Sequence, residues 1–292
     1  MSEELDPVAL RDAYDEQLRC RMPDRLPDGT TVELDGPVIR VTGLDPRGFV
    51  TARSLDGVPD LDALIAAQRD FYAARGQSVE WKVHGHDRPD LVPRLRAAGF
   101  LPEEEEMVMI GLAAPLADPT PPLPAGVRLR EVTDRIDLDR IAYMETRVWR
   151  EDHGFLADGL EKEITADPLG TTIVVAEREP GPGGDAGAAS EVEADDGAGG
   201  DGPVLSAGWI RFVGGTQFAT LWGGSTLPDW RGRGIYRALV GYRAALATAR
   251  GFTHLEVDAS PDSRPILQRC GFVPVTSTTP YVFRPNASPA PA

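Results

Sequence analysis

Hydrophobic and polar residues follow short, regular blocks in the second half of the chain, and these blocks predict alternating strands and helices. Runs rich in β-branched residues predict strands at 127–133, 171–179, 204–214, 217–227, 254–258 and 272–283. Apolar residues at helical spacing predict helices at 134–149, 156–166, 234–250 and 262–270. The predicted order is therefore β-α-α-β-β-β-α-β-α-β.

The first half shows fewer blocks of the same kind. Helices are predicted at 7–21, 61–75 and 90–98, and strands at 31–41, 49–54, 79–84 and 106–112. The last four elements of this half follow the order helix, strand, helix, strand. The second half ends in the same order.

The two halves also share their final sequence. LRAAGFLP at Leu95–Pro102 matches LQRCGFVP at Leu267–Pro274 in its Leu, Gly, Phe and Pro positions. Upstream, Gly76 and Gly251 each follow Ala-Arg between a helix and a strand. A helix that ends in Gly is common, so chance explains one such match. Two matches in the same order favour an internal duplication.

Three segments interrupt the blocks and suggest the domain boundaries. The proline-rich segment 116–124 predicts a linker between a domain at 1–115 and a domain at 125–285. The segment 180–203 is rich in Gly and acidic residues, and we expect a disordered insertion at the tip of a hairpin. Recruitment of a basic partner by this insertion is left open. A disordered tail is expected at 286–292.

Charge and cysteine content narrow the function classes. The 46 acidic and 30 basic residues give a net charge of −16, which disfavours nucleic acid and anionic membranes as partners. The two cysteines suit a reducing compartment, and the acidic N-terminus lacks the apolar run of a signal peptide. We therefore expect a cytoplasmic protein. The four histidines are scattered, so no metal site is expected. A homodimer is left open.

The most informative motif lies where the predicted strand 217–227 leads into the helix 234–250. Two glycines within Arg231-Gly-Arg-Gly-Ile-Tyr236 permit a tight turn directly before the helix. The first N–H groups of a helix point outward and attract phosphate. From Val204 to Arg250 there are six arginines and one acid, a local charge of 6 − 1 = +5. The motif lacks the sequence signatures of nucleoside triphosphatases and of dinucleotide-binding folds. A purely structural turn is the remaining alternative.

Arg231-x-x-Gly234-x-Tyr236 resembles the R/Q-x-x-G-x-G/A signature of the GNAT superfamily of acyl-CoA N-acyltransferases. The resemblance covers about 127–284 and includes the element order. It implies an α+β fold with two GNAT-like domains, each a mixed, mostly antiparallel sheet flanked by helices. The first domain would be a degenerate copy, because its corresponding loop at 54–60 has one Gly and no Arg. An anion site is not expected there.

The resemblance implies acetyl-CoA as co-substrate, and it assigns cofactor-binding roles residue by residue. The residues concerned are Ser225, Thr226 and Leu227 for pantetheine, and Arg231, Arg233, Gly234, Ile235, Tyr236 and Arg237 for the pyrophosphate. Tyr236 departs from the usual Gly or Ala. Ser263 is expected to replace hydrogen bonds that an Asn, here Ser260, often makes in the family.

The resemblance further implies transfer of an acetyl group to a primary amine of a small molecule or protein, which needs a base. Candidate catalytic residues are Glu145 and Asp258, with Glu151, Asp152 and His153 as alternatives. Many family members carry a Tyr acid where this chain has Leu267. Tyr281 or water is expected to take that role. A non-catalytic module that binds CoA thioesters or a partner is the alternative function.

Overall fold

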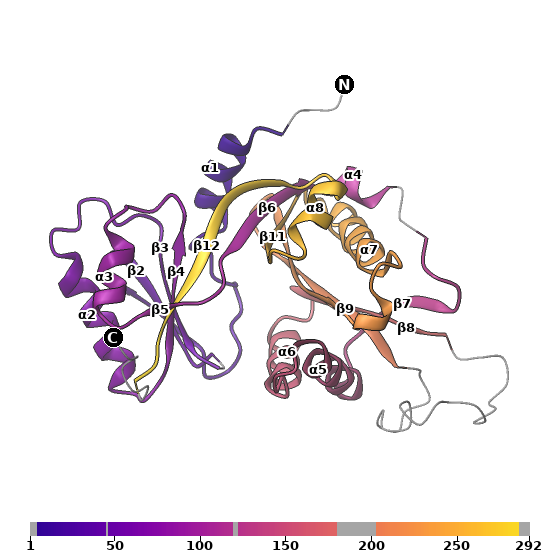
Figure 1. The fold of residues 1–292 in the computed structure, drawn as a ribbon, viewed down its shortest axis with the longest axis horizontal. Helices are drawn as coiled ribbons and strands as arrows, with labels where there is room; N and C mark the ends of the chain where they lie inside the picture. The colour runs from indigo at the N-terminus through magenta and orange to yellow at the C-terminus, as the bar shows by residue number, and fades with distance from the viewer. Residues whose placement is uncertain (1–4, 45, 119–121, 180–202, 286–292) are drawn as a thin grey trace. The chain divides into compact units, whose positions relative to one another are not determined.

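The computed structural model describes residues 5–44, 46–118, 122–179 and 203–285. The chain forms two compact units. Unit 1 comprises Met1–Ile110 and Val257–Ala292, and unit 2 comprises Gly111–Glu256. Unit 2 is thus inserted between two stretches that together build unit 1. Figure 1 shows the elements of both units.

Unit 2 contains the predicted β-α-α-β-β-β-α-β succession. Its strands are β7 (Val127–Val132), β8 (Thr171–Arg178), β9 (Val204–Phe212), β10 (Phe218–Thr226) and the first part of β11 (His254–Ala259). Its helices are α4 (Ala113–Ala117), α5 (Arg135–Trp149), α6 (Phe155–Ala166) and α7 (Ile235–Ala249), with a 3-10 turn η1 (Pro228–Trp230). The sequence patterns did not predict α4 and η1. Strands β7 to β10 pair antiparallel in chain order, and β10 pairs with β11 in parallel.

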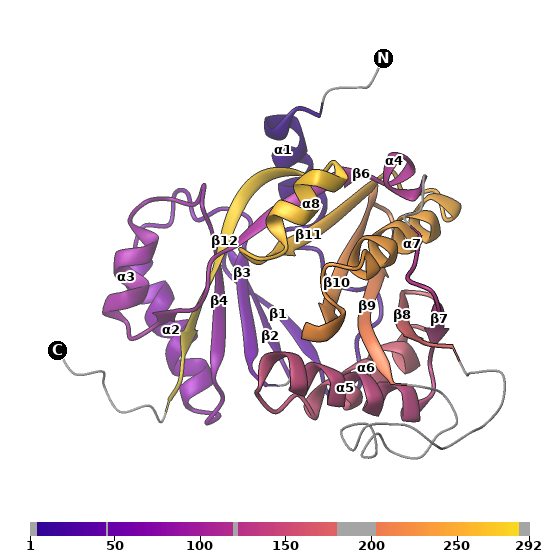
Figure 2. The same cartoon turned by 45° about the vertical axis from the view of Figure 1, so that its right-hand side comes forward.

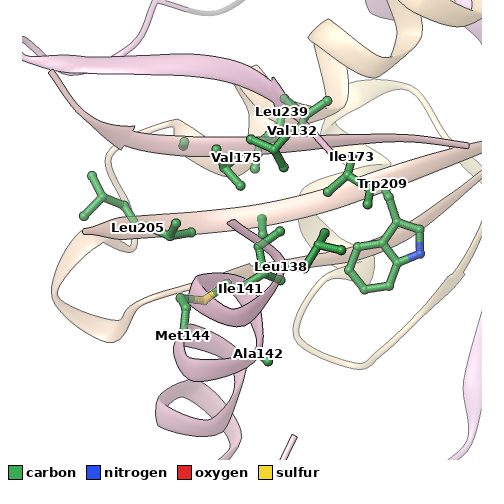
Figure 3. Packing of buried hydrophobic residues seen from close by; sticks show 14 of the residues in the cluster. Val132, Leu138, Ile141, Ala142, Met144, Ile173, Val175, Leu205, Trp209 and Leu239 are labelled. Carbon is green, nitrogen blue, oxygen red and sulfur yellow. The ribbon is translucent and has the colours of Figure 1, made fainter. Parts of the chain in front are cut away.

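Buried apolar residues join the sheet of unit 2 to its helices. Figure 3 shows Leu138 and Ile141 of α5 packing against the sheet, with Leu138 beside Trp209 of β9. Gly208 of β9 faces α7 instead, because a Cβ there would meet the guanidinium of Arg243. Side chains of neighbouring strand residues point to opposite faces. Helix α5 therefore covers one face of the sheet and α7 covers the other.

Unit 1 combines the N-terminal half with the end of the chain. Its helices are α1 (Pro7–Gln17), α2 (Leu61–Ala73), α3 (Leu91–Ala97) and α8 (Arg264–Cys270). Its strands are β1 (Thr31–Asp35), β2 (Val38–Thr42), β3 (Gly48–Ala52), β4 (Val79–His84), β5 (Leu101–Pro102), β6 (Glu106–Leu112) and β12 (Val273–Phe283). Strands β1 to β3 are antiparallel, β3 and β4 are parallel, and β12 lies between β4 and β6, antiparallel to both. Figure 2 shows β12 beside β4.

One predicted strand was wrong in its extent. The expected strand 31–41 is a hairpin of β1 and β2, because Gly36 turns the chain with a φ of 61°. Gly before Pro at this point is a turn signal that the hydrophobic pattern alone did not reveal. The expected helices at 61–75 and 90–98 and the strands at 79–84 and 106–112 are confirmed with small shifts at their ends.

The internal repeat is visible in the backbone. Gly99 and Gly271 follow α3 and α8 with φ angles of 91° and 107°, and Gly76 and Gly251 follow α2 and α7 with φ angles of 63° and 84°. The matching leucines and phenylalanines of the repeat are all buried: Leu95, Leu267, Phe100 and Phe272. The same glycine-ended helices thus occur twice in the same order, as the sequence match predicts.

The compact units do not follow the predicted domain boundaries at the C-terminal end. Residues 257–285 belong to unit 1, because β12 completes its sheet by pairing with β4 and β6. The expected hairpin around the acidic insertion is present as the antiparallel pair β8 and β9. Most of the expected insertion at 180–203 lies outside the described residues, namely 180–202. The same holds for residues 119–121 of the proline-rich linker and for the expected tail at 286–292.

Candidate functional site

The start of α7 has the geometry that the glycine motif predicts. Gly232 and Gly234 adopt φ angles of 73° and 85°, which favour Gly. Gly234 occupies the N-cap position, and no side chain caps the helix there. Ile235 is buried and anchors the first turn. The first N–H groups of this 15-residue helix therefore face outward without a side-chain cap.

Three of the arginines lie exposed around this helix start: Arg231, Arg233 and Arg237. The Arg231 Nε donates to the Thr226 carbonyl over 3.0 Å, which ties the loop to the end of β10. The Arg233 guanidinium lies 4.7 Å from the centre of the Trp230 ring. Each of the two side chains is thus held beside the loop by one contact. Both residues are exposed, so an anion can approach their guanidinium groups.

The other three arginines of the expected cationic patch have different roles. Arg211 pairs with Glu163 of α6 through two hydrogen bonds of 2.7 Å. Arg243 is buried in unit 2, and Arg250 donates to the Leu169 carbonyl. The expected +5 charge is therefore not concentrated at the loop. Arg231, Arg233 and Arg237 supply the local charge.

Strand β10 changes its pairing next to this loop. Its parallel ladder with β11 ends at Thr220, and its antiparallel ladder with β9 has a bulge between Gly223 and Ser225. Trp222 pairs with Trp209, and Ser225 pairs with Ala207. The extra residue places Ser225 on the same face of the sheet as Trp222, the face that α5 covers.

Backbone groups at the end of β10 are already engaged within unit 2. The Ser225 carbonyl accepts a hydrogen bond from the Ser206 hydroxyl over 2.6 Å, and the Leu227 N–H donates to the Leu205 carbonyl over 2.9 Å. The Tyr236 ring lies so close to Gly224 that a Cβ on Gly224 would come within 2.7 Å of it. The bulge therefore packs directly against the first turn of α7.

These features fit a phosphate or pyrophosphate group. A side chain at Gly232 would meet no other atom within 4 Å, so the loop is open on its outer side. The uncapped helix start and the three exposed arginines provide N–H donors and positive charge. A phosphate group therefore finds donors from both backbone and side chains at one loop.

Glu145, the expected base, lies beside the bulge. Its side chain is buried, and its Oε2 accepts a hydrogen bond from the Trp149 Nε1 over 2.8 Å. The same Nε1 lies 3.2 Å from the Ser225 hydroxyl. Burial raises the pKa of Glu145 above its ordinary value, against the opposing effects of Ser225, Trp149 and the nearby His153. A raised carboxyl pKa suits a group that takes up a proton near neutral pH.

The other predicted site residues belong to unit 1. Asp258 forms an ion pair with Lys82 of β4. Tyr281 is buried in the core of unit 1 and pairs across the strands with Trp81, the position of a structural aromatic residue. The Ser263 hydroxyl donates to the Ser260 carbonyl over 3.2 Å. Leu267, at the position of the family's usual Tyr, is fully buried.

The sequence patterns missed two residues that shape the site. Trp149 reaches both Glu145 and Ser225, yet in the sequence it is one more apolar residue at the end of a helix. Arg243 donates to the Trp222 carbonyl next to the bulge and to the Trp209 carbonyl on β9, over 3.0 and 3.2 Å. Its partner Gly208 leaves the space that the guanidinium fills. A glycine on a strand that faces an Arg of a neighbouring helix reveals this contact only when the fold is known.

Two kinds of feature are absent from the described residues. No helix among them combines the length and apolar character that crossing a membrane requires. Within the same ranges, no three His, Cys, Asp or Glu side chains gather in a way that suits a metal ion.

Comparison with known proteins shows similarity in structure. No family model and no curated protein sequence matches the chain. A GCN5-related N-acetyltransferase from Kribbella flavida is 15% identical, with a TM-score of 0.60 over 94% of this chain and 95% of that one. A tandem GNAT protein from the clavulanic acid biosynthesis pathway is 16% identical, with a TM-score of 0.57 over 90% and 86%. A GCN5-related N-acetyltransferase from Sphaerobacter thermophilus is 16% identical, with a TM-score of 0.56 over 88% and 83%. The chain therefore has the α+β fold of the GCN5-related N-acetyltransferases, over a length that also matches a tandem member.

Proposed function

We propose that this chain is an N-acetyltransferase that moves an acetyl group from acetyl-CoA to a primary amine. The observation that carries the proposal is a juxtaposition in unit 2. An uncapped helix start with three exposed arginines lies next to the bulged end of β10, and a buried carboxyl group lies on the other side of that bulge. The two sides of one bulge thus offer an anion site and a base.

The cofactor would be held by residues of the loop and of β10. Arg231, Arg233 and Arg237 would face the pyrophosphate together with the N–H groups from Gly234 to Tyr236, and Ser225 to Leu227 would lie along the pantetheine arm. Acetyl-CoA supplies the activated acyl thioester. The chain's own contribution is to fix this arm beside Glu145 through the loop and the bulge.

Glu145 would remove the proton from the acceptor ammonium. Its burial raises its pKa, so the carboxylate is a stronger base than an exposed Glu. The free amine then attacks the carbonyl carbon, the attacking nitrogen gives its second proton to water, and the carbon–sulfur bond breaks as the thiolate leaves. In our proposal the thiolate takes its proton from water, because Leu267 is apolar and Tyr281 fills the core of unit 1.

Two measurements test the proposal. Isothermal titration calorimetry with acetyl-CoA is expected to give a dissociation constant well below millimolar. A panel of primary amines is then screened for release of free CoA thiol. Binding without thiol release would favour the alternative, a module that binds CoA thioesters without turnover. No binding below millimolar concentration would sink both functions.

A matched pair of glycine variants separates the site from general stability. Gly234 and Gly251 lie at the two ends of α7 with φ angles of 85° and 84°, so an Ala at either carries a similar backbone strain. Only Gly234→Ala disturbs the proposed anion site. We expect it to weaken acetyl-CoA binding at least tenfold relative to Gly251→Ala, at similar melting temperatures.

A cytoplasmic location and a homodimer stay predictions.

A further inference from the structure

Two large aromatic side chains are not covered on the sheet face of unit 2 where Glu145 lies. Trp149 of α5 is 54% exposed and Trp222 of β10 is 43% exposed. A folded protein ordinarily covers indoles of this size, so two exposed tryptophans on the sheet face that also carries a candidate catalytic carboxyl group indicate a binding surface. Because of the bulge, Trp222 and Ser225 lie on the same face of the sheet, and Ser225 contacts Trp149.

Each indole is held in one orientation by its own N–H group. The Trp149 Nε1 points at the Glu145 carboxylate, which leaves the rest of the ring outside. The Trp222 Nε1 donates to the Thr220 hydroxyl over 2.7 Å. Fixed aromatic rings bind flat ligands at a low cost in side-chain entropy.

The Trp222 ring already has a cation of the protein over it, so a ligand cation has poor access to this ring. The Arg211 guanidinium already lies 4.1 Å from the centre of the Trp222 ring, and Glu163 holds it there. It occupies the place over the ring that a ligand cation would take. The surface therefore suits one positive charge, located at Glu145.

Glu145 itself lacks a partner for one oxygen. Within the described part of the chain, its Oε1 is buried and receives no hydrogen bond. A buried carboxylate oxygen without a donor is costly, and a ligand ammonium would supply the donor. Trp149 contacts the carboxyl group that would pair with this ammonium, and Trp222 lies on the same face of the sheet.

We infer that the acceptor is a monocationic arylalkylamine, a primary amine on a short chain that ends in an aromatic ring. The inference rests on the proposed function and names its substrate class. The ammonium pairs with Glu145, and the ring packs against Trp149 and Trp222. Simple alkylamines lack the aromatic ring. Polyamines lack it too, and they carry more than one positive charge.

The test compares 2-phenylethylamine, butylamine and spermidine in kcat/KM for acetyl transfer. We expect 2-phenylethylamine to exceed the other two at least 30-fold, as two ring contacts allow. Trp222→Leu is expected to reduce this preference about tenfold. Tyr143→Leu, which removes another exposed aromatic ring of α5, is the matched control and is expected to leave the preference unchanged.

Equal use of butylamine, or a preference for spermidine, would overturn the inference and leave acetyl transfer standing. Calorimetry of the same amines on the chain saturated with CoA gives a readout that does not need turnover. Tighter binding of 2-phenylethylamine that Trp222→Leu abolishes supports the surface even if no thiol is released. Equal binding of all three amines rejects it. Binding without thiol release rejects the proposed function instead.

Discussion

The two units contain the same strand-to-helix step with opposite chemistry at the helix start. In unit 1, α2 begins after Asp60, whose Oδ1 accepts a hydrogen bond from the Ala63 N–H over 2.8 Å. Asp62 adds a second negative charge to the first turn. In unit 2, α7 begins after Gly234 and has no side-chain cap. One helix start is closed by carboxylates, and the other is open.

The difference shows how a duplicated element loses or keeps a ligand site. A capping Asp stabilises a helix by about 1 kcal/mol, and α7 forgoes that gain. In exchange, its first N–H groups stay available to an anion. Helix α2 has the stabilising cap, and its carboxylates repel a phosphate. A single side chain at the cap thus marks which unit we expect to bind acetyl-CoA.

The largest expected effect concerns two carboxyl groups with raised pKa values, one in each unit. Glu145→Gln is expected to lower the rate of acetyl transfer about a thousandfold, because the base is lost. It also removes the rise in rate with pH that ionisation of Glu145 produces in the parent chain. Glu106 of unit 1 has a pKa raised to about 7 by burial and by Asp258, so Glu106→Gln is the matched control. Steady-state kinetics at several pH values measure both, and an equal loss in Glu106→Gln would break the comparison between the units.

The same two variants are expected to gain stability at neutral pH. Burial raises both pKa values, so the folded chain binds more protons than the unfolded chain above pH 4.5, the ordinary pKa of Glu. The free energy of unfolding therefore falls as the pH rises through this interval, which for Glu106 ends near pH 7. Gln removes this penalty. Denaturant unfolding of each variant at pH 5 and pH 8 checks the gain, which should be larger at the higher pH.

The next effect is expected from copying the unit 1 cap into unit 2. Gly234→Asp places a carboxylate at the proposed pyrophosphate site and offers a cap to the first N–H groups of α7. We expect acetyl-CoA affinity to fall about a hundredfold, a loss consistent with one buried like charge. Gly251→Asp, at the other end of the helix, has the same backbone strain and serves as the control in calorimetry. An unchanged affinity in Gly234→Asp would place the anion site elsewhere.

A smaller loss is expected from the arginines of the open loop. Arg231→Ala removes a cation and the hydrogen bond that ties the loop to the Thr226 carbonyl. We expect a roughly tenfold weaker affinity for acetyl-CoA, with a larger deficit at low salt than at high salt. Arg25→Ala removes an exposed arginine of unit 1 and should leave the affinity as it is. Titrations at two ionic strengths distinguish a local contact from an effect of net charge.

The smallest effect is expected in the closed loop. Asp60→Ala removes the cap of α2 and should lower the free energy of unfolding by about 1 kcal/mol. Acetyl-CoA affinity should not change, because the loop of unit 1 lacks both the second glycine and the arginines. Chemical denaturation and calorimetry on the same variant give the two answers. A gain of a second CoA site would show that the cap alone closes unit 1.

Local patterns were sufficient for most of the elements and for the loop before α7. Strand β4 and helix α5 have the extent that their apolar spacing predicts, and the glycines of the motif have the expected positive φ angles. These features depend on residues that are neighbours in sequence. Periodicity and turn chemistry therefore carry enough information to predict them.

Features that depend on distant residues could not be predicted in this way. In the sequence, Arg243 resembles the other arginines of the expected cationic patch. It is buried, because Gly208 of strand β9 leaves room for its guanidinium. The bulge at Gly224 decides which face Ser225 occupies, and only the pairing with β9 reveals it. The destination of β12 was also missed, because a strand carries no local sign of its partners.

The position of β12 has a consequence for synthesis on the ribosome. Unit 1 needs residues 273–283 between β4 and β6, and these are made after the whole of unit 2. The whole of unit 2 has left the ribosome before they emerge, whereas the first half of unit 1 must wait with the edges of β4 and β6 unpaired. Although its first stretch precedes unit 2, unit 1 is therefore completed after unit 2, and a nascent chain stopped just short of β12 would expose two strand edges.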